Sequence, residues 1–412
     1  MFHAASAGLE ERLASGRPIA AYNGFDPSGP WLHVGHLVPI FGLIALQRHG
    51  GRPVVVVGGG TGMIGDPAGR AAERALLDDD TISANVAELR EQLGRFLDFE
   101  PGPTGALMVD NRDWLGKLTL IDFLRDVGKH FTIPYMLAKD SVQGRLERGL
   151  SYTEFSYMLL QAVDFAHLRR NLDVELQMGG ADQWGNITAG LELIRRTTTF
   201  ADGREPAFAL AYPLLLTPSG TKFGKSESGD SIWLHAAGTS PYAFYQHWLN
   251  TDDRDVGLYL RWFTTLEHEE IEAAEAGHAG RPEMRSAQRL IARDLTARVH
   301  GEAAAAHAVA VSEAAFSRAP IVDPGVLATL HEAADGFWFE AADVAGGVVR
   351  LCVASGIFSS NGEARRAIAG GGLTINERRI ASADAPLPDP IHGEWLVVRL
   401  GRRKVRVGRR RP

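Results

Sequence analysis

The chain has 412 residues, of which 45% are hydrophobic and 23% charged, and a formal net charge of −7. These values are ordinary for a globular protein of about two to three domains, and the net charge argues against nonspecific nucleic-acid binding by the whole chain. The single cysteine, Cys352, excludes an intramolecular disulfide and a cysteine-rich zinc site, and favours a reducing, cytoplasmic compartment. The first residues lack the apolar segment of a signal peptide, and the apolar runs are too short to span a membrane.

The first half of the chain alternates strand and helix patterns. AAYNGF (20–25) predicts a strand, LVPIFGLIALQRHG (37–50) a helix that stops at a glycine, and PVVVVGG (53–59) a buried parallel strand. Further strands are expected at ALMVDN (106–111) and VELQMGG (174–180). Strand, helix and strand in this order form a βαβ unit, which predicts an α/β fold.

His33 and His36 stand in FDPSGPWLHVGH, where the first strand passes to the first helix. A metal site needs three or more ligands, and only Asp26 and His49 lie near in sequence, so a metal is disfavoured. Core histidines are the alternative. Because a helix start presents unpaired N–H groups, and because Gly35 lets a flat ring or a phosphate approach the backbone, the pattern favours nucleotide binding.

The glycines of GGGTGMIGDPAG follow a predicted strand and contain G-x-G-x-x-G as Gly60, Gly62 and Gly65. This pattern occurs in dinucleotide-binding folds but is weak alone, and the alternative is a turn that packs a helix closely on the sheet. No GK[ST] closes the run, so it is not a P-loop. Asp66, at the end of this loop, is expected to face the occupant of the cleft.

A helix is predicted for SYTEFSYMLLQAVDFAHLRR (151–170), which begins with the capping-box pattern S-x-x-E. Tyr157, Gln161 and Asp164 are spaced to share one face of it. This polar stripe is either the solvent face of a surface helix or the wall of a pocket. Solvent faces favour Lys, Glu and Arg, so we favour the pocket.

Two lysines, Lys222 and Lys225, stand in the Gly-, Ser- and Thr-rich segment TPSGTKFGKSESGD (217–230). Such a loop can close over an anion, and the alternative is an ordinary exposed loop. The residues that follow predict helices, one at 239–250 with a serine or threonine cap and a first-turn proline, and a helical region at 267–316.

The C-terminal part predicts a small α+β unit after a connector at 334–347. Helices are expected at 347–355 and 361–369, followed by a turn and strand in GGGLTINERRI. The last segment, RLGRRKVRVGRRR (399–411), has no acidic residue. It is either a local electrostatic footprint for a polyanion or a solvated, disordered tail.

Taken together, these motifs resemble those of one family. HVGH is similar to the "HIGH" signature of class I aminoacyl-tRNA synthetases, and KFGKS resembles their "KMSKS" signature in the form common in bacterial tyrosyl-tRNA synthetases. YNGFDPS, VGGGTGMIGDP, DVGKHF, FSYMLLQAVDF and GGADQWGNI also resemble that family. LCVASGIFSSNGEARRAIAGGGLTIN is similar to an S4-type RNA-binding module, so the resemblance covers nearly the whole chain.

The resemblance implies a fold and an order of domains: a Rossmann-like parallel-sheet catalytic domain, an α-helical domain and a small α+β S4-like domain. The expected boundaries are 1–217 for the catalytic domain with a dimer-forming insertion near 110–150, 218–238 for a mobile loop linker, 239–318 for the α-helical tRNA-binding domain, 319–342 for a linker and 343–412 for the S4-like RNA-binding domain.

The resemblance also implies a two-step reaction, in which tyrosine attacks ATP to give tyrosyl-adenylate and pyrophosphate, and the tyrosyl group then passes to the 3′ end of its tRNA. Catalysis would depend on positioning and on stabilising charge on the phosphates. The implied catalytic residues are His33, His36, Lys222, Lys225 and Ser28. Mg²⁺ is expected to arrive with ATP, so no protein-only metal site is required.

The resemblance also implies which residues bind tyrosine, ATP and RNA. Tyr22 and Asp164 would read the phenol hydroxyl, and Asp66, Tyr157 and Gln161 would hold the α-ammonium. The full expected sets are Tyr22, Asp66, Tyr157, Gln161, Asp164 and Gln183 for tyrosine; Gly35, Gly180, Asp182, Asn23 and Ser226 for ATP; and Arg365, Arg366, Arg378 and Arg379 for RNA. Asn111 and Trp114 would line the cleft. A homodimer without membrane contact is expected.

Four alternatives are set against this interpretation. The related tryptophan enzyme is disfavoured by Tyr22 and Asp164, which suit a phenol. An adenylate-forming enzyme without tRNA does not account for the basic C-terminal unit. A noncatalytic RNA-binding protein on a synthetase scaffold does not account for the intact histidines and lysines. A dehydrogenase rests on the glycine pattern alone.

Overall fold

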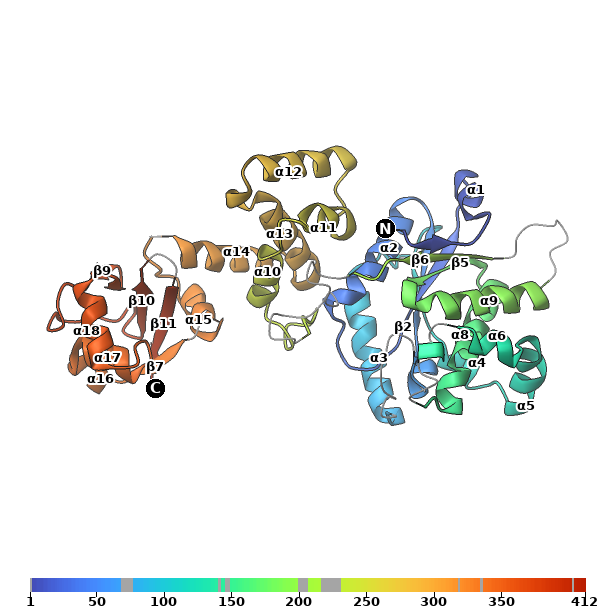
Figure 1. Cartoon of the computed structure of the whole chain (residues 1–412), viewed down its shortest axis with the longest axis horizontal. Coiled ribbons are helices and arrows are strands. Elements are labelled where there is room, and N and C mark those ends of the chain that lie inside the picture. The colour runs from blue at the N-terminus through green and yellow to red at the C-terminus, as the bar shows by residue number, and fades with distance from the viewer. Residues whose placement is uncertain are drawn as a thin grey trace. The chain divides into compact units, whose positions relative to one another are not determined.

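The computed structural model describes residues 2–67, 77–139, 142–144, 149–198, 207–215, 231–317, 319–333, 336–401 and 404–412. The chain divides into two compact units, Met1–Thr239 with Thr251–Ala287, and Ser240–Asn250 with Gln288–Pro412 (Figure 1). The division passes through the stretch that we expected to form one helical domain. Among the described helices, none has both the length and the apolar composition that crossing a bilayer requires.

The first unit is built on a six-stranded sheet with the order β1-β6-β5-β2-β3-β4. All neighbouring strands are parallel except β1, which pairs antiparallel with β6. The strands are β1 Ala4–Ala5, β2 Ala20–Phe25, β3 Arg52–Val57, β4 Leu107–Asp110, β5 Val174–Gly180 and β6 Phe208–Tyr212. The predicted α/β class with a parallel sheet is confirmed.

The helices of the first unit connect and flank these strands. They are α1 Leu9–Ala14, α2 Leu37–Arg48, α3 Asp79–Leu93, α4 Arg112–Leu115, α5 Leu120–Asp122, α6 Ile133–Leu137, α8 Tyr152–Asn171, α9 Trp184–Thr197, α11 Val256–Phe263 and α12 His268–Gly280. The predicted cap of α8 is present, since Ser151 Oγ accepts the N–H of Glu154 at 3.2 Å. This bond satisfies one of the N–H groups that a helix start leaves unpaired.

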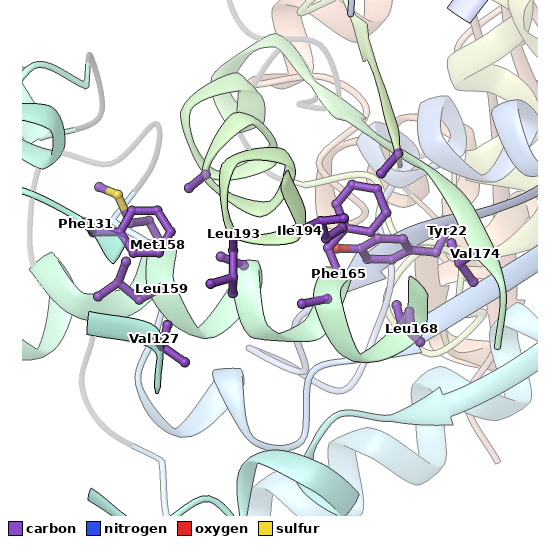
Figure 2. Packing of buried hydrophobic residues seen from close by; sticks show 14 of the residues in the cluster. Tyr22, Val127, Phe131, Met158, Leu159, Phe165, Leu168, Val174, Leu193 and Ile194 are labelled. Atoms are coloured by element: carbon purple, nitrogen blue, oxygen red, sulfur yellow. The ribbon is translucent and has the colours of Figure 1, made fainter. Parts of the chain in front are cut away.

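A continuous apolar core joins the sheet to α8 and α9. Side chains alternate between the two faces of a strand, and the members Tyr22, Val54 and Val56 all face this side. Phe165 of α8 packs on Tyr22 with 5.4 Å between ring centroids, and Leu193 of α9 lies in the same cluster (Figure 2). Burial of this apolar area fixes α8, and with it the helix face that carries Asp164.

The direction of strand succession reverses at β2. From β2 the chain passes to β3 and β4 on one side, whereas β5 and β6 lie on the other. In an open parallel sheet this reversal leaves a crevice at the carboxyl ends of the strands, where ligands bind. The carboxyl ends of β2, β3 and β5 are therefore the place to look for a site.

The second unit contains a five-stranded sheet with the order β7-β11-β10-β8-β9. Its strands are β7 Phe337–Phe339, β8 Leu373–Ile375, β9 Arg378–Arg379, β10 Trp395–Leu400 and β11 Lys404–Arg410. Its helices are α10 Pro241–Leu249, α13 Ser286–His300 (which crosses the unit boundary), α14 Glu302–Phe316, α15 Pro324–Ala333, α16 Ala341–Ala345, α17 Gly347–Ala354 and α18 Asn361–Ala369. Separate apolar clusters pack α17 and α18 on one side and α14 and α15 on the other.

The C-terminal region differs from three expectations. The connector at 334–347 contains β7 and α16, because Phe337 and Phe339 bury their rings on one side of the sheet while Trp338 remains exposed. The disordered-tail alternative fails because β11 pairs with β10 and with β7 and buries Val407 completely. The expected linker at 319–342 likewise contains α15 and β7.

Candidate active site

His33 and His36 lie at the carboxyl side of β2. His33 is the N-cap and His36 the last residue of a single 3₁₀ turn, η1, which covers Val34–His36 and leads into α2. Nδ1 of His33 accepts the N–H of Gly35 at 3.1 Å, and Nδ1 of His36 accepts the N–H of His33 at 3.1 Å. The two ring centroids are 4.0 Å apart. Nδ1 of His36 also lies 3.3 Å from the carbonyl oxygen of His33. In the tautomer in which each Nδ1 accepts, each ring carries its proton on Nε2, and Nε2 is then the atom that can donate.

The pKa of His36 is lowered to about 3, because the ring is desolvated and because His33 lies beside it. His36 is therefore neutral at physiological pH and can donate a hydrogen bond without carrying a charge. Gly35 has no room for a side chain, since a Cβ there would lie 2.8 Å from Cε1 of His33. The glycine of HVGH thus allows the ring of His33 to fold back over its own backbone.

Asp164 is the centre of a buried polar cluster beside β2. Its Oδ2 accepts from Nδ2 of Asn111 at 2.9 Å, and its Oδ1 accepts from Nε1 of Trp114 at 2.7 Å. Trp114 stacks on His167 with 4.4 Å between centroids. Both carboxylate oxygens are oriented by a donor and only 3% of Asp164 is exposed, so the carboxylate is held in one place. The solvent-face interpretation of the α8 stripe is therefore wrong for Asp164.

The cluster continues to Asp26, at the end of β2. Nδ2 of Asn111 also donates to Oγ1 of Thr61 at 2.9 Å, and Thr61 donates to Oδ1 of Asp26 at 2.7 Å. The hydroxyl of Tyr157 donates to Oδ2 of Asp26 at 2.8 Å. One chain of hydrogen bonds thus joins the ends of β2, β3 and β4 to α8. Sequence reasoning missed Asp26 and Thr61 as parts of this site.

Tyr22 is 2% exposed, and its hydroxyl has no hydrogen-bond partner among the described residues. Gln177, its register partner on β5, has a buried Oε1 in the same condition within that part of the chain. Burial and the nearby carboxylate of Asp164 raise the pKa of Tyr22 well above its ordinary value. A buried hydroxyl without a partner destabilises the free protein, which is understandable if a ligand supplies the partner.

A second polar group lies at the ends of β3 and β5. Nε2 of Gln183 donates to Oδ2 of Asp66 at 2.6 Å. Nδ2 of Asn186 donates to Oε1 of Gln161 at 3.1 Å and to Oε1 of Gln183 at 3.3 Å. The structure therefore brings together three of the residues predicted to bind tyrosine: Asp66, Gln161 and Gln183. Asn186, which connects them, was not identified from the sequence.

Other predicted residues have different surroundings. Asn23 is 1% exposed, and its Nδ2 donates to the carbonyl of Pro39 at 3.2 Å and to the hydroxyl of Tyr212 at 3.4 Å, so its contacts join β2 to α2 and β6. Ser28 is exposed just after β2. Gly180 leaves space for Asp182, whose Oδ1 would lie 2.6 Å from a Cβ at that position. Lys222, Lys225 and Ser226 lie outside the described residues.

The arginines of the C-terminal unit divide into two groups. Arg365 and Arg366 on α18 and Arg378 and Arg379 on β9 are exposed. The tail arginines instead contact their own unit, as in the 2.9 Å pair of Arg399 with Glu377, the cation–π contact of Arg406 with Phe337, and the 2.7 Å pair of Arg409 with Glu394. In the part of the chain that the structure describes, no group of three or more His, Cys, Asp or Glu side chains is suited to a metal ion.

We predict opposite stability effects for two buried tyrosines. Tyr22→Phe removes a hydroxyl that has no described partner and should raise the free energy of unfolding by about 1 kcal/mol. Tyr212→Phe removes a hydroxyl that contacts Asn23 and Met178, and should lower it by about 1 kcal/mol. Urea unfolding of the ligand-free proteins measures both. A loss of stability in Tyr22→Phe equal to that in Tyr212→Phe would show that the Tyr22 hydroxyl is already satisfied.

We also predict a pH-dependent stability that originates at Asp164. Burial raises the pKa of Asp164 from 3.8 to about 7, while hydrogen bonds from Asn111 and Trp114 oppose the rise. Between these values the folded protein retains a proton that the unfolded chain has lost, so stability falls as pH increases through that window. The limiting slope is about 1.4 kcal/mol per pH unit. Urea unfolding from pH 4.5 to 7.5 should show this slope in the wild type and lose it in Asp164→Asn; parallel curves would contradict the prediction.

The chain is similar to known proteins both in sequence and in structure. Residues 14–317 match the family "tRNA synthetases class I (W and Y)", and residues 337–407 match "Tyrosine–tRNA ligase SYY-like C-terminal domain". The tyrosine–tRNA ligase of Roseiflexus castenholzii is 48% identical over 98% of this chain and 95% of its own length. That of Anaeromyxobacter dehalogenans is 50% identical over the same shares. A truncated mitochondrial tyrosyl-tRNA synthetase of Aspergillus nidulans, 28% identical, aligns over 76% of this chain and 91% of its own with a TM-score of 0.68.

Proposed function

The chain belongs to the class I tRNA synthetases of the tryptophan and tyrosine family, and we propose that it acts as a tyrosine–tRNA ligase. The observation that carries the choice of tyrosine is the pair formed by Asp164 and Tyr22. Asp164 is a buried carboxylate oriented by two donors, and the hydroxyl of Tyr22 beside it has no described partner. Such a pair suits a ligand that brings a phenol hydroxyl.

In the first step a carboxylate oxygen of tyrosine forms a bond to the α-phosphorus of ATP, and the bond from that phosphorus to the pyrophosphate oxygen breaks. Negative charge increases on the phosphate oxygens during this exchange. His33 and His36 donate from Nε2 to those oxygens, and their fixed hydrogen bonds through Nδ1 hold them ready. No nucleophile from the protein is required.

The phenol hydroxyl of the substrate donates to Asp164 and accepts from Tyr22. Phenylalanine in the same position leaves the Tyr22 hydroxyl buried without a described partner and gives Asp164 no donor beyond Asn111 and Trp114, which disfavours it. Asp66, Tyr157 and Gln161 face the α-ammonium, with Gln183 holding Asp66 and Asn186 holding Gln161. The shared chain through Asp26 keeps both ends of the tyrosine site in register.

Lys222 and Lys225 complete the phosphate site by neutralising the departing pyrophosphate, with Ser28 and Ser226 as further donors. We propose that ATP binding also involves Gly35, Gly180, Asp182 and Asn23. Mg²⁺ enters as part of the nucleotide substrate, bound to its phosphates, because magnesium in such sites is held largely by phosphate and water.

In the second step the 3′-terminal ribose hydroxyl of tRNA attacks the tyrosyl carbonyl carbon and AMP leaves. We assign tRNA binding to the helical region at 239–318 and the S4-like segment 343–412. The exposed arginines of α18 and β9 support this assignment, because phosphate contacts from Arg position RNA without reading its bases. A cytoplasmic location is part of the same proposal, and the single cysteine, Cys352, supports it.

Charge reversal on β9 tests the RNA assignment. Arg378→Glu with Arg379→Glu should raise the KM for tRNA about 10-fold and leave the rate of tyrosyl-adenylate formation unchanged, since two phosphate contacts are lost. Aminoacylation assays at two salt concentrations measure this effect. Arg17→Glu with Arg90→Glu, which reverses two exposed arginines of the other unit, serves as the charge-matched control. Equal losses in both variants would place the RNA site elsewhere.

We further propose that two copies form a homodimer through the insertion near 110–150. Four large apolar side chains there are exposed by about half to two thirds: Leu120, Ile121, Leu124 and Ile133, with 69%, 67%, 47% and 58% of their areas. Several large apolar side chains exposed in one short stretch of the chain support a protein interface there.

The experiment that tests the ligase function is amino-acid-dependent exchange of pyrophosphate into ATP, run with each of the twenty amino acids. Exchange with tyrosine alone is the expected result. Exchange with tryptophan or another amino acid would retain the phosphate chemistry and overturn the assignment of Tyr22 and Asp164. Absence of exchange with every amino acid would overturn the ligase and favour an RNA-binding protein on a synthetase scaffold.

A further inference from the structure

Residues 232–234, which belong to the first unit, pair with the HVGH segment. The N–H of Val34 donates to the carbonyl of Ile232 at 2.9 Å, and the N–H of Leu234 donates to the carbonyl of Leu32 at 2.7 Å. These bonds form an antiparallel bridge that sets His33 opposite Trp233. The pair lies between the two hydrogen bonds, which is the geometry that brings opposed side chains closest.

The bridge has two different faces. Leu32, Val34, Ile232 and Leu234 point inward, and each is at most 9% exposed. The alternate residues carry rings on the other face: Trp31 and His33 on one segment, Trp233 and His235 on the other. We call these four residues, with His36, the ring ladder.

Contacts along the ring ladder are continuous. His235 stacks on Trp31 with 5.2 Å between centroids and 6° between planes, and Trp31 meets Trp233 edge to face at 6.0 Å. Trp233 meets His33 edge to face at 6.2 Å, and His33 lies 4.0 Å from His36. Aromatic pairs in these arrangements have preferred angles, so each ring restricts the next.

Trp233 is also held by contacts with Gly238 and Thr239. Its backbone N–H donates to Oγ1 of Thr239 at 2.9 Å. A Cβ on Gly238 would lie 2.7 Å from the indole, so the indole rests directly on the Gly238 backbone. Trp233 thus has a backbone on one side and the ring of His33 on another.

We propose that Trp233 is a positioning residue that holds the His33 imidazole in the orientation from which its Nε2 donates. This inference rests on the proposed function, which gives His33 its role toward the phosphates. Gly35 and His36 restrict the His33 ring from its own turn, and Trp233 restricts it from the opposite segment. Purely structural packing is the competing explanation, and it predicts loss of stability without any special dependence on His33.

A double-mutant cycle separates the two explanations. Trp233→Leu should lower kcat for tyrosyl-adenylate formation about 10-fold in the wild-type background and less than about 2-fold in the His33→Ala background, with the KM for tyrosine unchanged in both. Trp233→Phe, which retains an aromatic edge, should recover activity to within about 3-fold of wild type. His235→Leu removes the ladder ring furthest from His33 and is the matched control. Equal losses in both backgrounds, or an equal loss in His235→Leu, would overturn the proposal.

A spectroscopic measurement tests the position of His33 without relying on activity. In protein labelled with ¹⁵N-histidine, the His33 signals are identified by their loss in His33→Ala. We expect the wild type and His235→Leu to show one tautomer at His33, protonated on Nε2, and Trp233→Leu to show averaging of the two nitrogens. An unchanged His33 signal in Trp233→Leu overturns the positioning role even if the exchange assay has overturned the ligase, so the two failures are distinguishable.

Discussion

Replacing Asp164 with asparagine should lower the preference for tyrosine over phenylalanine, measured as the ratio of kcat/KM values, by about 10- to 100-fold. The estimate follows from about 1.5–3 kcal/mol for a hydrogen bond to a charged group inside a protein. Asparagine nearly preserves the volume of the side chain, but its amide replaces one acceptor oxygen with a donor. Nδ2 of Asn111 and Nε1 of Trp114 both donate to the wild-type carboxylate, so one of these donors then meets another donor. The substrate hydroxyl competes for the remaining oxygen.

Two features of this experiment make it specific. Phenylalanine brings no hydroxyl, so its kcat/KM should change little, and the loss should fall on tyrosine. Glu175→Gln is the control, because it removes a carboxylate of the same sheet that pairs with Arg12 at 2.7 Å and lies outside the polar cluster. We expect it to lower stability and to leave the preference unchanged. Full preference in Asp164→Asn would show that another group reads the hydroxyl.

The elements predicted from sequence are those with strong local signals. The β-branched run of β3 and the cap and apolar face of α8 could be located because each pattern acts within one segment. The strand β11 was not predicted, because the segment 399–411 was interpreted from its positive charge alone. Yet Val405 and Val407 alternate with Lys404 and Arg406, and this period of two was the available signal for a half-buried strand. Charged side chains at alternate positions of a strand are compatible with burial of the side chains between them.

The site was predictable only in part, for a similar reason. Tyr157, Gln161 and Asp164 share a helix face, so spacing alone grouped them. Asp26 and Thr61 belong to separate loops, and they meet because β2 and β3 are neighbours whose carboxyl ends coincide. No local pattern contains that information. An aspartate directly after a predicted central strand was the one usable signal, since parallel sheets bind ligands at that edge.

Replacing His36 with alanine should reduce kcat for tyrosyl-adenylate formation by about 10²- to 10³-fold, as removal of one preorganised donor does elsewhere. The KM for tyrosine should stay the same, because the polar cluster around Asp164 contains neither histidine. Since the pKa of His36 is lowered to about 3, its ring donates while neutral from pH 6 to 9, and its contribution to kcat should not titrate there. Rapid-quench measurement of adenylate formation at several pH values tests both statements. His49→Ala, at the exposed far end of α2, is the matched control and should remain active. A wild-type rate that falls with a pKa near 6.5 and becomes independent of pH in His36→Ala would show that His36 acts as an imidazolium, and the neutral-donor mechanism would then be wrong.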